Sequence, residues 1–236
     1  MGAGGRGLAG AGRGILTAAR HPSRRALRVS RTALAAHAEK LGACRLCPRV
    51  AGRPVVAVPE AAAPLLLVGQ APGPREERER RLFAYTAGRR LFEWFARLGV
   101  SEEEFRRRVW MAATIRCFPG RAPGGGDRPP TPEEIATCTP HLEREIELLA
   151  PLTIIAVGKL AMERFLPPAP LFERVGRRFE VERAGHCFEV IPLPHPSGRS
   201  TWMVREENRA LLDRALRLLS ESAGWQAAFG ERNQEP

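Results

Sequence analysis

Five cysteines give this chain a possible metal-binding set. Cys44 and Cys47 form a CxxC pair, Cys117 ends an apolar run, and Cys138 follows a loop rich in Gly and Pro. That loop can bring Cys117 and Cys138 together, and the N-terminal pair can pack beside them. Four thiolates at one place suit either a tetrahedral zinc or an iron–sulfur cluster. We therefore predict a four-cysteine metal site with Cys187 left over, against the alternative of separate buried thiols.

Two turns rich in Gly or Pro are the second candidate for chemistry. One reads GQAPG at residues 69–73 and the other reads HPSG at residues 195–198, and each directly follows an apolar run. In open α/β sheets, ligands bind at the carboxyl ends of the strands. The turns would place Gln70 and His195 over one sheet edge. This arrangement predicts a small planar ligand with chemistry beside it.

The elements that must position these turns follow an alternating pattern. Continuous apolar runs are typical of strands that are covered on both faces of a parallel sheet, and amphipathic helical patterns lie between them. This alternation predicts a three-layer α/β/α sandwich with a central, mainly parallel four-stranded sheet. The predicted strands are 65–68, 109–115, 152–157 and 188–193, and the predicted helices are 87–98, 132–149, 160–166 and 206–219.

The positive charge is concentrated near the N-terminus. The formal net charge is +11, but seven arginines precede the first acidic residue, Glu39, so the remainder carries +4. We predict a basic tail over residues 1–36, which is a disordered arm, a transit-like segment or translated sequence upstream of the true start. The folded domain is predicted over 37–222 and a polar C-terminal tail over 223–236. No apolar run has the length of a membrane span.

The order of these features resembles the uracil-DNA glycosylase superfamily. The CxxC pair, the GQAPG turn, the two loop-separated cysteines and the HPS turn occur in that order between Cys44 and Leu219. Within the superfamily the chain is most similar to the iron–sulfur branch called family 4. The resemblance implies that Cys44, Cys47, Cys117 and Cys138 hold a 4Fe-4S cluster that stabilises loops near DNA, with zinc as the alternative.

The resemblance also implies a pocket for a base that has left the DNA stack. The backbone of Gln70 and Ala71 would line this pocket and help to place the attacking water. Phe83 would stack on the base, with Tyr85 as a rival, and His195 would donate a hydrogen bond to a carbonyl oxygen of the base. Such a donor stabilises the negative charge that develops on the departing base. His195 and Gln70 are thus the predicted catalytic residues.

Two positions depart from the family 4 pattern. The family usually has Glu where this chain has Gln70, and an amide can position a water but cannot take its proton. The family commonly has an Asn that reads the uracil edge where this chain has Ala113, although Thr114 would substitute if the register slips by one. Losing a bidentate amide should weaken discrimination by about 1–3 kcal/mol. The departures predict a pocket with weaker preference for uracil.

The predicted contacts to DNA are polar residues that flank the two turns. Ser197 and Arg199 belong to or follow the HPS turn, and the segment after it occupies the place of a loop that enters the minor groove. Arg121 and Arg128 lie in the Gly/Pro loop and are candidates for phosphate contact. These four residues complete the predicted site.

We expect a monofunctional DNA glycosylase of base-excision repair that acts as a cytoplasmic, nucleoid-associated bacterial monomer, with DNA as partner and no membrane. No lysine stands in either turn to form a Schiff base, so water is the expected nucleophile. The alternative is a non-catalytic module that binds damaged or single-stranded DNA, motivated by Gln70 and Ala113. A zinc-stabilised α/β protein with no role on DNA is a third hypothesis.

Overall fold

A five-stranded mixed sheet organises the structure, a computed structural model that describes residues 24–47, 50, 52–183, 185–197 and 201–230. The strand order is β2-β1-β3-β5-β4. Four strands are parallel, and β4 pairs antiparallel with β5 at one edge. The strands are β1 (Leu65–Gly69), β2 (Trp110–Ala113), β3 (Thr153–Val157), β4 (Phe179–Arg183) and β5 (His186–Leu193).

The α/β class and the four parallel strands are confirmed, and the number of strands is corrected from four to five. Strands β1, β2 and β3 are buried throughout, and so are the last four residues of β5, which is why continuous apolar runs reveal them. In β4, half-buried and exposed residues alternate instead. An edge strand with one wet face lacks the continuous apolar run on which the prediction relied.

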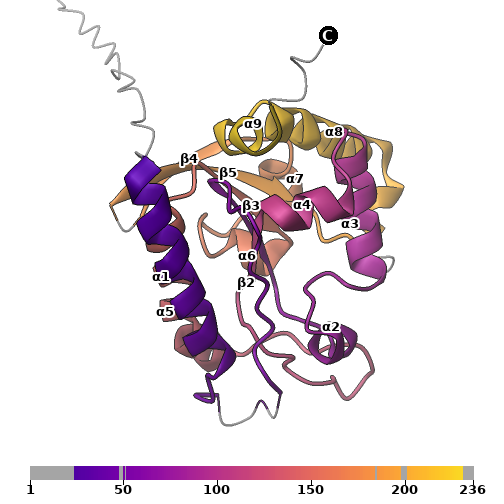
Figure 1. Ribbon diagram of the computed structural model, residues 1–236. Helices are drawn as coiled ribbons and strands as arrows, with labels where there is room; N and C mark the ends of the chain where they lie inside the picture. Colours follow the sequence, from indigo (N-terminus) through magenta and orange to yellow (C-terminus); the bar gives the residue numbers. More distant parts are fainter. Residues whose placement is uncertain (1–23, 48–49, 51, 184, 198–200, 231–236) are drawn as a thin grey trace, which may run out of the picture.

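Helices cover both faces of the sheet. In Figure 1, α1 and α5 lie side by side on one face, and α3, α4, α8 and α9 lie on the other. The helices of the described part are α1 (Arg24–Gly42), α2 (Pro74–Glu79), α3 (Thr86–Ala96), α4 (Glu102–Arg108), α5 (Pro132–Leu149), α6 (Lys159–Met162), α7 (Leu171–Arg174), α8 (Glu206–Ser220) and α9 (Ala223–Phe229), with a 3-10 turn at Thr201–Val204.

A helix reaches into each of the two segments that were predicted as tails. Helix α1 begins at Arg24, inside the segment 1–36 that was predicted as a tail, and its Leu34 is only 2 % exposed because the helix packs on α5. At the other end, α9 occupies part of the predicted tail 223–236. Trp225 and Phe229 are buried against Phe105 of α4. Apolar side chains too few to form a sequence pattern thus anchor both segments.

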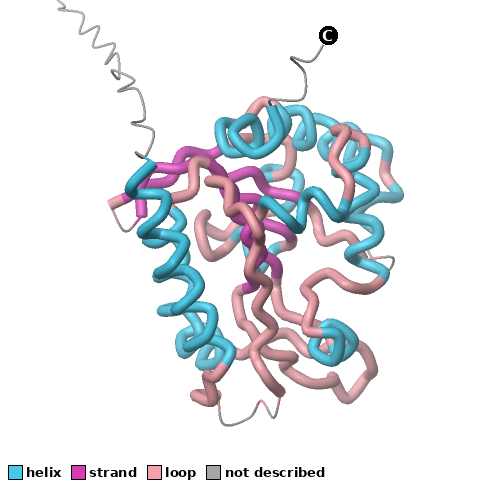
Figure 2. Tube along the Cα trace, in the orientation of Figure 1, coloured by secondary structure: helices cyan, strands magenta, loops and turns pink. Residues whose placement is uncertain are grey.

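The carboxyl ends of the four parallel strands meet at one edge of the sheet. In the view of Figure 2, the loops that follow β1 and β2 run through the lower part of the molecule. Within the described residues, no helix is both long and apolar enough to cross a membrane. The edge where the loops gather holds the candidate site.

Candidate functional site

The two predicted turns line one pocket at the carboxyl edge of the sheet. The pocket has a volume of about 670 Å³. Gln70 and Ala71 reach it from the end of β1, Ala113 from the end of β2, and His195 from the turn after β5. Phe83 forms another part of the pocket lining. The structure therefore brings together the residues that were predicted to surround the base.

The ring of Phe83 lies against the backbone where β1 ends. A β-carbon on Gly69 would stand 2.9 Å from the Cζ atom of Phe83, so this approach requires glycine. The ring is half-buried and belongs to the pocket lining. Tyr85, the rival aromatic, stands at the rim, where it is 51 % exposed and the Arg75 guanidinium lies 4.8 Å from its ring centroid. Phe83 is thus the inner aromatic and Tyr85 the outer one.

His195 stands on a turn that two neighbouring segments hold in place. A β-carbon on Gly158, directly after β3, would come within 3.3 Å of the His195 ring. Arg90 of α3 donates a hydrogen bond of 3.1 Å to the carbonyl oxygen of Ser197. Protein surrounds the imidazole on most sides although the pocket leaves it accessible to solvent, and this desolvation lowers the pKa of His195. The imidazole is therefore neutral near pH 7 and donates from a single ring nitrogen.

The end of β2 presents a methyl group to the pocket. Ala113 lines the pocket, whereas Thr114 turns away from it because its hydroxyl donates to the carbonyl oxygen of Gly69 at 3.2 Å. The backbone N–H of Thr114 donates to the same oxygen at 2.9 Å. The register slip that would let Thr114 replace an asparagine therefore does not occur.

Two carboxylates lie in the described pocket lining, and each already has partners. Glu76 accepts hydrogen bonds from the backbone N–H groups of Gly73, Phe83 and Ala84, while burial raises its pKa. Asp127 forms an ion pair with Arg121 at 3.5 Å. Glu76 therefore joins the GQAPG turn to the segment that carries Phe83. Its backbone partners could not be predicted from the sequence.

The arginines predicted to contact DNA occupy different environments. Arg121 and Arg128 line the pocket, but Arg121 pairs with Asp127 and Arg128 forms a two-pronged ion pair with Glu134. Ser197 lines the pocket as well, and Arg199 lies outside the described residues. Sequence analysis gave no pocket role to Arg75 and Arg78, which also line it. The sequence shows that Arg75 and Arg78 are charged, but it does not show that they belong to the pocket lining.

Four cysteines surround a second, smaller pocket, of about 20 Å³. Cys44, Cys47, Cys117 and Cys138 all line it, and all are free thiols. Burial, together with the neighbouring Cys138, Cys47 and Cys44, raises the pKa of Cys117 to about 12. Cys187 is exposed on β5 and does not line this pocket. The donor set therefore fits a thiolate-bound metal group.

The spacing of these thiols differs from that of a site for a single metal ion. Among the described residues, no three side chains of His, Cys, Asp or Glu are grouped closely enough to hold a single metal ion. Besides the cysteines, the pocket is lined by apolar residues and by four polar ones, Arg45, Arg116, Thr137 and His141. The thiols come from three separate segments of the chain, so a group bound by all four would join those segments.

Helix α2 connects the two pockets. Its Glu77 accepts a hydrogen bond of 2.9 Å from the backbone N–H of Arg53, which follows the CxxC segment. Arg80, the residue after α2, donates to the carbonyl oxygens of Arg53 and Pro54. The same helix begins directly after the GQAPG turn. Helix α2 therefore links the chain near the cysteines to the turn at the larger pocket.

A buried ion pair lies behind the cysteine pocket. Arg116, next to Cys117, pairs with Glu145 of α5, and both side chains are almost fully inaccessible. His37 of α1 stands 3.9 Å from the other oxygen of Glu145, and its ring centroid is 5.7 Å from that of His141. Burial, together with the nearby His141 and Arg116, lowers the pKa of His37 to about 4. Near neutral pH, His37 is therefore uncharged where α1 meets α5.

Comparison with known proteins places the chain in a family. Residues 56–220 match the family model of the uracil DNA glycosylase superfamily. The type-4 uracil-DNA glycosylase of Archaeoglobus fulgidus is 32% identical over 140 residues, which are 57% of this chain and 66% of that protein. The type-4 uracil-DNA glycosylase of Thermotoga maritima is 30% identical over 161 residues, covering 67% of this chain and 79% of that protein.

A type-5 relative is also similar. The type-5 uracil-DNA glycosylase of Thermus thermophilus is 30% identical over 195 residues, covering 70% of this chain and 82% of that protein. The predicted family is confirmed by these matches, and the predicted family 4 branch by its type-4 members. The chain belongs to the uracil-DNA glycosylase superfamily.

Proposed function

We propose that this chain is a monofunctional DNA glycosylase that releases uracil or a related deaminated base from DNA. The observation that carries the proposal is the joint placement of Gln70, Phe83 and His195 around one pocket at the carboxyl edge of the sheet. A base inside a duplex cannot reach such a pocket, so it must first leave the stack, at a cost of roughly a few kcal/mol. The ring of Phe83 offers a surface on which the extruded base can stack.

The reaction breaks the bond between C1′ of the deoxyribose and a ring nitrogen of the base. Positive charge develops on the sugar and negative charge on the base, and the oxygen of a water then bonds to C1′. The electron pair of the broken bond leaves with the base. One proton of the water is lost, and the base takes up one proton, so an abasic sugar and a free base result. No electron is transferred to or from the protein.

His195 is the proposed electrophilic partner of the leaving base. Its lowered pKa keeps the imidazole neutral near pH 7. A neutral imidazole donates one hydrogen bond to a base carbonyl oxygen where negative charge accumulates. Gln70 and the adjacent backbone of Ala71 are proposed to place the water. The amide of Gln70 cannot accept the proton, so positioning rather than base catalysis is its role.

Cys44, Cys47, Cys117 and Cys138 are proposed to hold a 4Fe-4S cluster, with zinc as the less favoured alternative. The pocket that all four thiols line supports this ligand set. A cluster would link these segments covalently. Hydrolysis of the N-glycosidic bond requires no change of oxidation state. Its role would be structural, and α2 would transmit it to the larger pocket.

DNA contact is proposed for Ser197 and Arg199 and for Arg121 and Arg128. Arg121 and Arg128 would have to exchange their carboxylate partners for phosphate oxygens, or keep them and bind only weakly. We also propose that the protein acts as a cytoplasmic monomer with a folded domain near residues 37–222, extended by α1 and α9.

The test is release of free base from a uracil-containing oligonucleotide, followed by alkaline cleavage at the abasic site. Purified protein should cleave, and His195→Ala should reduce the rate constant by about 100-fold or more, the loss typical when a donor to a developing anion is removed. Lys159→Ala serves as a control, because Lys159 stands after β3 but does not line the pocket. Equal activity of wild type and His195→Ala would refute the assignment.

The second candidate function is a DNA-binding module without turnover. It is favoured by Ala113, which offers no hydrogen bond to the base edge, and by Gln70 in place of a carboxylate. This hypothesis predicts binding to uracil-containing DNA that weakens steeply with salt and no abasic product. Single-turnover reactions with excess protein decide between the two functions, since a binding module forms a complex but releases no base.

A further inference from the structure

The segment that carries Phe83 has an unusual backbone conformation. Phe83 has φ 54°, in the left-handed region that a bulky residue avoids. Phe83 is not in a helix or strand, so no regular hydrogen-bond ladder holds it there. Contacts with neighbouring residues hold it instead. Three groups surround this backbone, and each contacts a different part of it.

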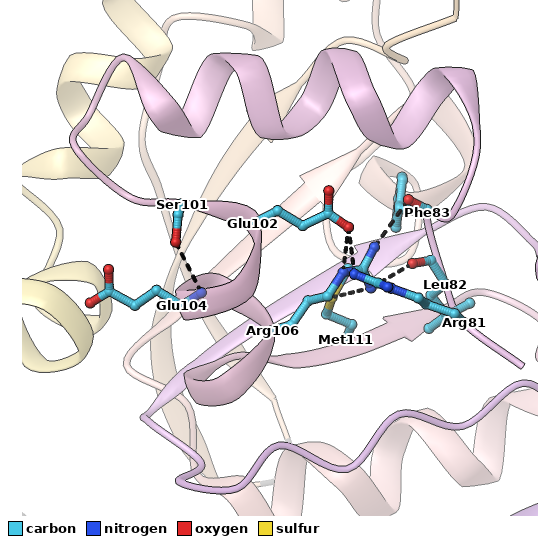
Figure 3. Close-up of polar contacts among 8 residues, drawn as sticks. All are labelled: Arg81, Leu82, Phe83, Ser101, Glu102, Glu104, Arg106 and Met111. Atoms are coloured by element: carbon cyan, nitrogen blue, oxygen red, sulfur yellow. Dashed lines mark hydrogen bonds and ion pairs between the residues drawn. The ribbon is translucent and has the colours of Figure 1, made fainter.

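Arg106 of α4 holds the carbonyl side of the segment. One nitrogen of its guanidinium donates to the carbonyl oxygen of Leu82 at 2.8 Å, and the other terminal nitrogen donates to that of Phe83 at 3.1 Å. Its Nε donates to Glu102 at 2.8 Å, one turn earlier on α4. Figure 3 shows the side chain of Arg106 extending from α4 between Glu102 and the Leu82–Phe83 segment.

The amide side is held by Glu76, and the third contact is steric. Glu76 accepts from the N–H groups of Phe83 and Ala84. Gly88 of α3 packs so closely that a β-carbon there would lie 1.7 Å from the carbonyl oxygen of Phe83. The guanidinium of Arg106 also lies 4.7 Å from the ring centroid of Phe92 on α3. Arg106 is thus fixed by a carboxylate and an aromatic face before it contacts the segment.

We propose that Arg106 is a positioning residue that holds Phe83 in its left-handed conformation, so that the ring faces the pocket and can stack on the extruded base. The proposal rests on the proposed function for the meaning of that stacking. Arg106 does not line the pocket, so it acts through the Leu82–Phe83 segment, which does. Glu102 supports it by orienting the guanidinium.

The planar fork of arginine is essential to this role. One guanidinium reaches two successive carbonyl oxygens and a carboxylate at the same time, whereas the single ammonium of a lysine cannot match these three directions. Arg106→Lys preserves the charge but should release at least one carbonyl. The neighbouring Arg108 provides a matched control, because it donates to the carbonyl oxygen of Ala228 at 2.8 Å and stands 4.0 Å from Glu104. That contact fixes α9 rather than the Phe83 segment.

The first experiment is a double-mutant cycle on uracil release. Arg106→Lys should lower kcat/KM about tenfold, within the loss expected when stacking of one base is impaired. In a Phe83→Ala background, Arg106→Lys should cause no further loss. Arg108→Lys should leave kcat/KM unchanged in both backgrounds. Equal losses from Arg106→Lys with and without the Phe83 ring would overturn the proposal, because a general loss of stability is additive with the ring deletion.

The second experiment does not depend on activity. Amide hydrogen exchange over residues 80–86 should be faster in Arg106→Lys than in wild type, and unchanged in Arg108→Lys. Unaltered exchange in Arg106→Lys would also overturn the proposal. If Arg106→Lys fails to fold, Glu102→Gln should accelerate exchange in the same segment to a smaller degree, and a lack of acceleration refutes the role. Inactive wild-type protein with the expected exchange pattern would refute the proposed function while leaving the positioning of Phe83 intact.

Discussion

The Cζ atom of Phe83 lies only 2.9 Å from the point where a β-carbon on Gly69 would stand. The last residue of β1 thus touches the inner aromatic of the pocket through bare backbone. Gly69→Ala should push the ring away and lower kcat/KM for uracil release about 10- to 100-fold, equivalent to a loss of about 1–3 kcal/mol of stacking. Steady-state kinetics on a uracil-containing oligonucleotide measures this.

Gly42→Ala is the control for the Gly69 substitution. Gly42 ends α1, and a β-carbon there would meet no atom within 4 Å. This variant should keep wild-type kcat/KM. If Gly69→Ala is as active as Gly42→Ala, the ring of Phe83 moves freely or does not take part in base binding.

Ala113→Asn should increase discrimination in favour of uracil. The methyl group of Ala113 faces the pocket at the end of β2, where an amide could donate to and accept from the edge of a base. The added contact should increase the ratio of kcat/KM for uracil over that for other deaminated bases by about tenfold. Competition assays with a panel of oligonucleotides that carry single lesions test this.

Thr114→Val serves as the comparison for Ala113→Asn. Its hydroxyl bonds to the Gly69 carbonyl and not to the pocket, so its removal should cost stability but leave the ratio between substrates unchanged. A changed ratio in Thr114→Val, or an unchanged ratio in Ala113→Asn, would show that another wall of the pocket sets the preference.

Cys117→Ser should abolish binding of iron, whereas Cys187→Ser should leave it unchanged. Cys117 lines the small pocket with three other thiols, and Cys187 is exposed elsewhere. The measurements are iron and sulfide per protein molecule and broad visible absorption of protein purified without oxygen. Stoichiometric zinc in colourless wild-type protein would establish the alternative metal. Equal iron content in both variants would exclude this four-cysteine ligand set.

Acidification should weaken the fold through His37. Its pKa is lowered to about 4 in the folded protein, against 6.5 for an ordinary histidine, because burial disfavours the charged ring. The unfolded chain therefore binds the proton more readily, so the contribution of His37 is complete above pH 6.5 and declines as the pH falls toward 4. The decrease should reach about 2–3 kcal/mol in the free energy of unfolding.

Urea unfolding at pH 7 and at pH 5 tests the role of His37. The charged and titratable groups around it are His141, Arg116, Arg144 and Glu145. His37→Gln does not titrate, so its free energy of unfolding should fall less than that of wild type between the two pH values. Parallel decreases in the two proteins would assign the acid sensitivity to other groups.

The sequence was most informative where one chemical property repeats locally. Runs of apolar residues predicted the four parallel strands, since strands covered on both faces have few polar positions. The alternating burial of β4 hid that strand. Helix α9 was missed because its seven residues are held by Trp225 and Phe229 rather than by a long amphipathic pattern. Long-range packing decided both cases.

In the site, too, some features could be predicted from the sequence and others could not. Gln70 and His195 could be predicted to meet, because both follow parallel strands and such ends share an edge. The left-handed backbone of Phe83 could not be predicted, because it depends on Arg106, a residue 23 positions away. The carboxylate of Glu76 is similar, since its backbone partners are separated from it by a turn of the chain. Contacts between side chain and backbone leave no repeating pattern in a sequence.

Because the pocket is built on the ends of parallel strands, the protein and the DNA deform to different degrees when a base enters it. The hydrogen-bonded register between β1, β2, β3 and β5 fixes the spacing of the residues that surround the base. A wall built in this way resists deformation, so adaptation falls to the nucleic acid, whose backbone must bend and unstack to deliver the base. Lesions that already weaken base pairing would then be processed fastest. The ease with which the duplex releases a base would discriminate between lesions before any of them contacts the pocket.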